Sequence, residues 1–359
     1  MPLPWRESAS LILAAGNELK ILFLQRAAGG SFSKNRVFPG GVIHPDDFSL
    51  KWEGILSKTS QTNALIPPGG ARAPCLISKP GRLPAELGFR ICAIRETFEE
   101  SGILLARPRS RTATPAASLS ASDLSVWRKD VLKDGSKFFD LCHSHGLQPD
   151  VDALKIWSDW LTPLGLESGG KRFDTVFFVA EGDETAMKFE LSQEEMVGYQ
   201  WMSPMEALVA SQSAKLRLAP PQVYECSRLA QFSSAKELLR FANHRQQFGC
   251  ALTFPIRYKC KDGMVAIFPG DDAYPEKPDM LGESLPLTSD QTLAELRSGI
   301  KRLHRIETDT QDKLSAFHLN ITLRPGHCDP LVANPESSMR PKTSQLTGMF
   351  ASKASTKLR

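Results

Sequence analysis

One short stretch, Arg95–Ile103, restricts what this chain can fold into more than any other part of the sequence. If the stretch is helical, Glu96, Glu99 and Glu100 share one sector of the helix surface, because residues three and four apart are neighbours there. On roughly the opposite side, apolar residues recur at helical spacing: Leu87, Ile91, Ile94 and Phe98. The sequence therefore predicts a helix that buries one face in a core and presents three carboxylates on the other.

Carboxylates crowded in this way repel one another unless a cation lies among them. Oxygen ligands suit a hard ion, Mg²⁺ or Mn²⁺, better than zinc or copper. The alternative is an ordinary solvated face, which is what most adjacent glutamates form. Against that alternative, Pro84 and Gly102 mark the two ends of the helix, and Arg95 is placed to orient a neighbouring carboxylate. We therefore predict that the three glutamates are metal ligands.

Residues 95–103 resemble the second half of the Nudix box, the signature of hydrolases that act on a nucleoside diphosphate linked to another group. A glycine pair, Gly40-Gly41, precedes the helix and matches the start of that box, although residues 42–83 separate the two halves. The glutamate that the family carries in the first half would fall at Leu87, and Glu86 stands beside that position. We interpret 42–83 as an insertion that forms a long surface excursion, with a short helix near 47–57.

The resemblance implies an α/β fold, a Nudix-type α/β/α sandwich with a mixed sheet. We expect a Nudix hydrolase domain over 8–245, a small β-containing extension over 250–325 and a disordered basic tail over 335–359. Apolar runs and turn signals predict the secondary structure within these limits. The expected elements are a hairpin at 8–25, helices at 123–145 and 151–161, a strand at 171–180, a capped helix from Ser203, and strands at 252–258, 264–269 and 316–323.

Further segments are similar to the coenzyme A diphosphatase branch of this family, the motif-19 type. They are Q-R-A at 25–27, F-P-G-G at 38–41, W-L-T-P at 160–163, R-F-D-T-V-F-F at 172–178 and V-G-Y-Q-W at 197–201. The likeness implies Mg²⁺- or Mn²⁺-dependent hydrolysis of coenzyme A and acyl-CoA esters, giving 3′,5′-ADP and 4′-phosphopantetheine derivatives. Alternatives are another pyrophosphate substrate, namely ADP-ribose, NADH or an RNA cap, or a non-catalytic Nudix-fold binding module.

The resemblance also implies a role for each residue of the expected site. Glu96, Glu99, Glu100 and Arg95 form the expected catalytic set. Within it Glu99 is our choice of base, with Glu194 or Glu195 as substitutes, and the three glutamates of the helix hold the metal. We expect Gly40, Gly41 and Arg26 to bind substrate, and Lys34 and Arg36 could hold its phosphates or be ordinary surface charges.

Composition limits the remaining possibilities. The formal net charge of +4 gives no concentrated basic surface, so nucleic acid is an unlikely partner, and no apolar run is long enough to span a membrane.

Seven cysteines without a C-x-x-C pair favour reduced thiols in an intracellular compartment. Cys142, His143 and His145 lack metal-site spacing and predict a helix end. The family likeness predicts a peroxisome and otherwise the cytoplasm, because Thr356–Arg359 is not a clear peroxisomal signal. The oligomeric state stays open.

Overall fold

The structure is a computed structural model that describes residues 5–26, 35–109, 119–163, 171–184, 196–213, 215–281, 288–311 and 314–331. Its centre is an eight-stranded mixed sheet in the order β10-β2-β1-β9-β8-β12, with β3 on β2 and β4 on β1. Within it, β1 runs parallel to β9, and β2 and β4 run antiparallel to β1. The strands are β1 (Arg6–Ala15), β2 (Lys20–Arg26), β3 (Arg36–Val37), β4 (Gly40–Val42), β8 (Lys155–Leu161), β9 (Phe173–Glu181), β10 (Met196–Met202) and β12 (Leu252–Thr253).

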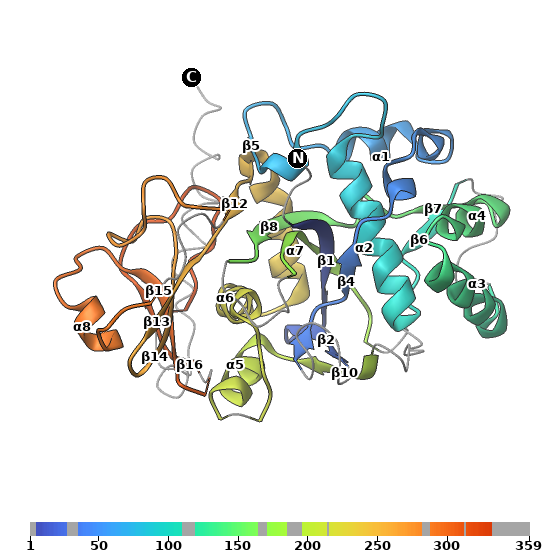
Figure 1. Ribbon diagram of the computed structural model, residues 1–359. Coiled ribbons are helices and arrows are strands. Elements are labelled where there is room, and N and C mark those ends of the chain that lie inside the picture. The colour runs from blue at the N-terminus through green and yellow to red at the C-terminus, as the bar shows by residue number, and fades with distance from the viewer. Residues whose placement is uncertain are drawn as a thin grey trace, which may run out of the picture.

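Both faces of this sheet are buried, because alternate side chains of each strand enter different cores. Leu11 and Leu13 of β1 pack on the side of α2 (Ala85–Ser101), whereas Ile12 and Ala14 pack on the side of α6 and α7. Figure 1 shows α2 on one side of the sheet and α6 (Pro220–Leu229) and α7 (Ala235–Arg245) on the other. The predicted α/β/α sandwich with a mixed sheet is therefore confirmed.

The insertion is more than a surface excursion, and our expectation for it was wrong in that respect. It contains η1 (Pro45–Phe48), η2 (Leu50–Gly54), α1 (Lys58–Asn63), β5 (Ala71–Arg72) and η3 (Pro74–Leu76). Phe48, Trp52 and Leu76 are buried in the same core as the apolar face of α2. The insertion also pairs through β5 with β11 (Gly249–Cys250). Its scattered apolar residues have no helical or strand period, which is why the sequence suggested a loop.

Two helices differ from prediction. The segment 151–161 is not helical, since β8 occupies Lys155–Leu161 between β9 and β12 in the sheet. Its Trp157 and Trp160, side-chain types that favour strands, fill the core on the α6 side. The segment 123–145 forms two helices, α3 (Ala121–Lys133) and α4 (Lys137–Ser144), because the chain turns at Gly135. A two-stranded ribbon of β6 (Ala106–Pro108) and β7 (Leu147–Pro149) flanks them.

The C-terminal part forms a four-stranded antiparallel sheet in the order β13-β14-β15-β16. The sequence predicted strands for most of it but missed β15. Its elements are β13 (Ile256–Cys260), β14 (Gly263–Ile267), α8 (Leu293–Arg297), β15 (His304–Asp309) and β16 (Leu314–Leu319). This sheet shares one continuous core with α6, so the division into 8–245 and 250–325 stays a prediction. The helix predicted from Ser203 is α5 (Pro204–Gln212), with the expected capping box.

The predicted basic tail, 335–359, lies outside the described residues. Among the residues that are described, no helix combines the length and the apolar character needed to cross a membrane.

Candidate active site

The three predicted carboxylates belong to α2, and contacts with the core and with α3 hold this helix in place. The predicted apolar stripe is buried, since Leu87, Ile91, Ile94 and Phe98 are each at most 1% exposed. The helix ends at Gly102 in the left-handed conformation, with φ of 76°, as the sequence predicted. Arg128 of α3 donates hydrogen bonds to the Glu99 and Glu100 carbonyl oxygens, at 2.8 and 3.2 Å, and so caps the helix. Sequence reasoning missed this capping arginine.

Arg95 organises the carboxylates around it. Its Nη1 donates to Glu96 Oε1 at 2.9 Å and to Glu99 Oε1 at 2.5 Å. Its Nη2 donates to the Val42 carbonyl oxygen at 2.9 Å, which ties the helix to β4. The guanidinium is nearly inaccessible, and the side chains of Glu96 and Glu99 are 14% and 12% exposed. The predicted orienting role of Arg95 therefore has a geometric basis.

Asp47 of η1 is the second partner of Arg95, and the sequence analysis did not identify it. Its two carboxylate oxygens accept from Arg95 Nε at 2.9 Å and Nη2 at 3.0 Å, and both side chains are buried. The backbone N–H of His44 also donates to Asp47, at 2.8 Å. This acid follows the glycine pair closely, at the near end of the insertion. That place in the sequence was the available signal.

The two positions at the far end of the insertion, Leu87 and Glu86, lie apart from the carboxylate group. Leu87 is a core residue at 1% exposure. Glu86, beside it, is paired with Arg72 of the insertion at 3.2 Å. Among the described residues, neither Leu87 nor Glu86 forms a hydrogen bond with Arg95, whereas Asp47 does so directly. Asp47 is therefore the acid of the insertion that partners this arginine.

Gly40 and Gly41 lie against the carboxylates and leave no room for a side chain. The Gly40 N–H donates to Glu100 Oε2 at 2.9 Å. Gly40 has φ of 152°, and a Cβ there would lie 2.3 Å from the Ala9 carbonyl oxygen. A Cβ on Gly41 would lie 2.3 Å from Glu96 Oε2. The structure thus brings Glu96 and Glu100 to the predicted glycine pair, and Arg95 joins Glu99 to the same group.

The electrostatics of the site fit a divalent cation. Burial raises the pKa of Glu96 to about 7, Arg95 opposes this rise, and the neighbouring Glu99 adds to it. A carboxylate whose ionised form is disfavoured by burial and by a second carboxylate gains most from added positive charge. The donor set consists of oxygen atoms, which Mg²⁺ and Mn²⁺ prefer. The assignment of Glu96, Glu99 and Glu100 as the ligands of such an ion stays a prediction.

Other predicted residues lie elsewhere or outside the described part. Arg26 ends β2, but the structure describes only its backbone, paired with Met196. Lys34, Glu194 and Glu195 lie outside the described residues. Arg36 donates to Gln25 Oε1 at 2.5 Å, and burial lowers its pKa.

Cys142, His143 and His145 lie at the end of α4, as the sequence predicted. His145 accepts a hydrogen bond from the Trp127 indole at 3.0 Å, and His143 stacks on Phe139. A cavity of about 440 Å³ is lined by Ser57, Arg109 and Gln148, among others, and by none of the predicted site residues.

Known protein families, individual relatives and a solved structure resemble this chain. The family model described as the NUDT19 Nudix domain matches residues 5–229, and that of the NUDT19 C-terminal domain matches 257–320. The acyl-coenzyme A diphosphatase NUDT19 of Gallus gallus is 37% identical over 93% of this chain and 97% of its own length. The human protein of that name is 34% identical over 90% and 93%. A NUDIX hydrolase structure from Alicyclobacillus acidocaldarius is 22% identical, with a TM-score of 0.49, and the match covers 65% of this chain and 94% of that one.

Proposed function

This chain belongs to the Nudix hydrolase family, in the group of the NUDT19 domains, and from that premise we propose that it hydrolyses the diphosphate bond of coenzyme A and acyl-CoA esters. The products are 3′,5′-ADP and 4′-phosphopantetheine or its acylated derivatives. Relatives named acyl-coenzyme A diphosphatase, matched over nearly their whole length, support this substrate. The observation that carries the site assignment is the contact of Glu96 and Glu100 with the Gly40–Gly41 backbone.

A diphosphate is difficult to hydrolyse because its anionic oxygens repel an approaching nucleophile. Mg²⁺ or Mn²⁺, held by Glu96, Glu99 and Glu100, would offset that negative charge when bound. The two glycines carry no side chain, so Glu96 and Glu100 can lie directly against the backbone of β4.

The side chains of the site have separate tasks in this proposal. A Glu99 carboxylate oxygen takes the proton of the attacking water, because Arg95 holds this carboxylate in place beside the other two glutamates. Glu100 is fixed by the Gly40 N–H, so its second oxygen has a defined direction. Arg95 keeps Glu96 and Glu99 in place without touching substrate, and is thus a positioning residue.

The test is a substrate panel with the purified full-length protein. Coenzyme A, an acyl-CoA, ADP-ribose and NADH are each incubated with Mg²⁺ or Mn²⁺, and 3′,5′-ADP or the corresponding product is quantified. We expect coenzyme A and acyl-CoA to be cleaved by the wild type, and Glu99→Gln and Glu100→Gln to lose at least a hundredfold in rate. If ADP-ribose is cleaved in preference, the substrate assignment fails. If the variants match the wild type on every substrate, the site assignment fails.

A peroxisomal location is also part of the proposal, and only the family likeness supports it. Fluorescence imaging of the full-length chain in cells, beside a peroxisomal marker, tests this. A diffuse cytoplasmic signal would favour the other location predicted from sequence.

A further inference from the structure

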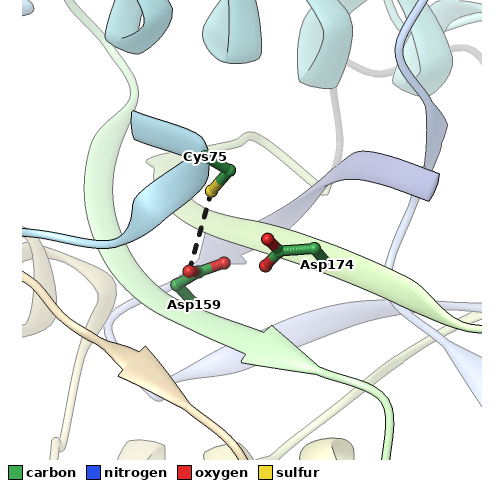
Figure 2. Close-up of side chains that lie close together, drawn as sticks. All are labelled: Cys75, Asp159 and Asp174. Carbon is green, nitrogen blue, oxygen red and sulfur yellow. Dashed lines mark hydrogen bonds between the residues drawn. The ribbon is translucent and has the colours of Figure 1, made fainter. Parts of the chain in front are cut away.

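A second group of chemically reactive side chains lies buried in the α2-side core. It consists of Cys75, Asp159 and Asp174, which are 6%, 0% and 3% exposed. One possible ligand atom from each lies within 4.8 Å of the other two. Figure 2 shows the two carboxyl groups turned toward one another and toward the sulfur. None of the three belongs to the candidate active site.

The fold brings these residues together from three separate segments. Asp159 of β8 lies opposite Val176 of β9, and Asp174 is two residues from Val176, so the aspartates are diagonal neighbours on one face. Cys75 comes from η3 of the insertion, which covers that face, and its thiol donates to Asp159 Oδ2 at 3.7 Å. Two acids at diagonal positions in a buried sheet face are unfavourable unless something neutralises them.

Among the residues that the structure describes, no cationic side chain neutralises this pair. The ion pairs formed by the described residues include neither Asp159 nor Asp174. Oδ1 of each aspartate is buried and accepts no hydrogen bond from an N–H group of the described residues. Burial, the charge of Asp174 and a hydrogen bond between the two carboxyl groups raise the pKa of Asp159 well above its usual range. Two neighbouring buried carboxyl oxygens without such a donor call for an explanation, and a ligand bound by both carboxyl groups would supply one.

We propose that Cys75, Asp159 and Asp174 bind a zinc ion. Zinc accepts sulfur and carboxylate ligands together, whereas Mg²⁺ and Mn²⁺ disfavour sulfur, so this donor set differs in kind from that of the three glutamates. On binding, the Cys75 thiol releases its proton to solvent and the thiolate joins the ion. The ion would then link η3 of the insertion to β8 and β9. Asp47, which accepts two hydrogen bonds from Arg95, belongs to the same insertion. The zinc site would therefore hold in place the segment that positions Arg95.

The experiment measures metal content and spectra on the full-length protein. Wild-type protein is incubated with Zn²⁺ in excess Mg²⁺, which occupies oxygen-only sites, then desalted and assayed for zinc. In parallel, Co²⁺ replaces Zn²⁺, and sulfur-to-cobalt charge-transfer absorption in the near ultraviolet reports a thiolate ligand. Variants are Cys75→Ala and Asp159→Asn. Cys142→Ala is the matched control, since Cys142 is also a fully buried cysteine of the same core. Circular dichroism checks that each variant is folded.

We expect one zinc equivalent and the cobalt band in the wild type and in Cys142→Ala, and loss of both in Cys75→Ala. Asp159→Asn should weaken zinc binding at least tenfold. Chelation of zinc should also speed proteolytic cleavage within residues 48–84 of the wild type. The proposal is overturned if folded wild type retains no zinc, which would mean that the aspartates share a proton instead. It is equally overturned if Cys75→Ala retains as much zinc as the control.

Discussion

Removal of the Asp47 carboxylate tests how the insertion supports the active site. Asp47 and Arg95 are a buried pair joined by two hydrogen bonds of 2.9 and 3.0 Å. Asp47→Ala leaves the guanidinium buried with two donors unpaired, and breaking a buried pair in this way costs about 3–5 kcal/mol of unfolding free energy. Asp47→Asn keeps the shape and one acceptor, and should cost about 2 kcal/mol.

Activity should fall as well, because Arg95 also holds Glu96 and Glu99. The loss of an outer partner of a metal-binding group typically lowers activity by about 10–100-fold. Urea unfolding followed by circular dichroism gives the stability change, and 3′,5′-ADP release from coenzyme A gives the rate. The rate is measured where each variant is still folded, so the two effects are separated.

Asp46→Asn is the matched control, at the neighbouring position in η1. The Asp46 side chain is 33% exposed and pairs with Lys51 at 2.5 Å, so its loss should cost less than about 1 kcal/mol and leave the rate unchanged. The reasoning is refuted if Asp47→Ala and Asp46→Asn have the same stability and the same rate.

Three further predictions concern the glycine pair, the helix cap and acid stability. Gly41→Ala places a Cβ against Glu96 Oε2 and should lower the rate more than about tenfold while costing only about 1–3 kcal/mol, as kinetics and urea unfolding will measure. Arg128→Gln removes two bonds to the end of α2 and should cost about 2–3 kcal/mol in the same unfolding assay; an unchanged midpoint would exclude the capping role. Burial lowers the pKa of His304 and of His327, so the unfolded state binds more protons than the folded state. The free energy of unfolding should therefore fall as pH drops below about 6.5, by up to about 1.4 kcal/mol per pH unit for each histidine. A flat profile between pH 7 and 5 would contradict this.

The helix of the glutamates could be predicted from the sequence because its signals are local. An apolar stripe, a glycine C-cap and three acids at helical spacing all lie within one segment, and each is found as expected. The contact of Glu100 with Gly40 spans 60 positions, and only the likeness to a known motif predicted it.

The parts that the sequence did not reveal depend on pairings between distant segments. Asp47 becomes important only when η1 packs on α2, since Asp46 follows the glycine pair just as closely and the sequence does not say which of the two meets Arg95. The segment that became β8 is short, and its strand conformation is fixed by its place between β9 and β12, which the local sequence does not reveal. Cys75 and the two aspartates are likewise far apart in sequence and meet only in the fold.

The central claim is that Glu96, beside the glycine pair, acts in hydrolysis through a divalent ion. The most direct measurement is kcat/KM for coenzyme A across a range of Mg²⁺ concentrations, for the wild type, Glu96→Gln and Glu86→Gln. Glu86 lies on the same helix but is engaged with Arg72 away from the glycines, so its variant is the control. We predict that Glu96→Gln loses at least a hundredfold at every Mg²⁺ concentration and that Glu86→Gln keeps the Mg²⁺ dependence of the wild type. Equal activity and equal Mg²⁺ dependence in all three proteins would contradict the account.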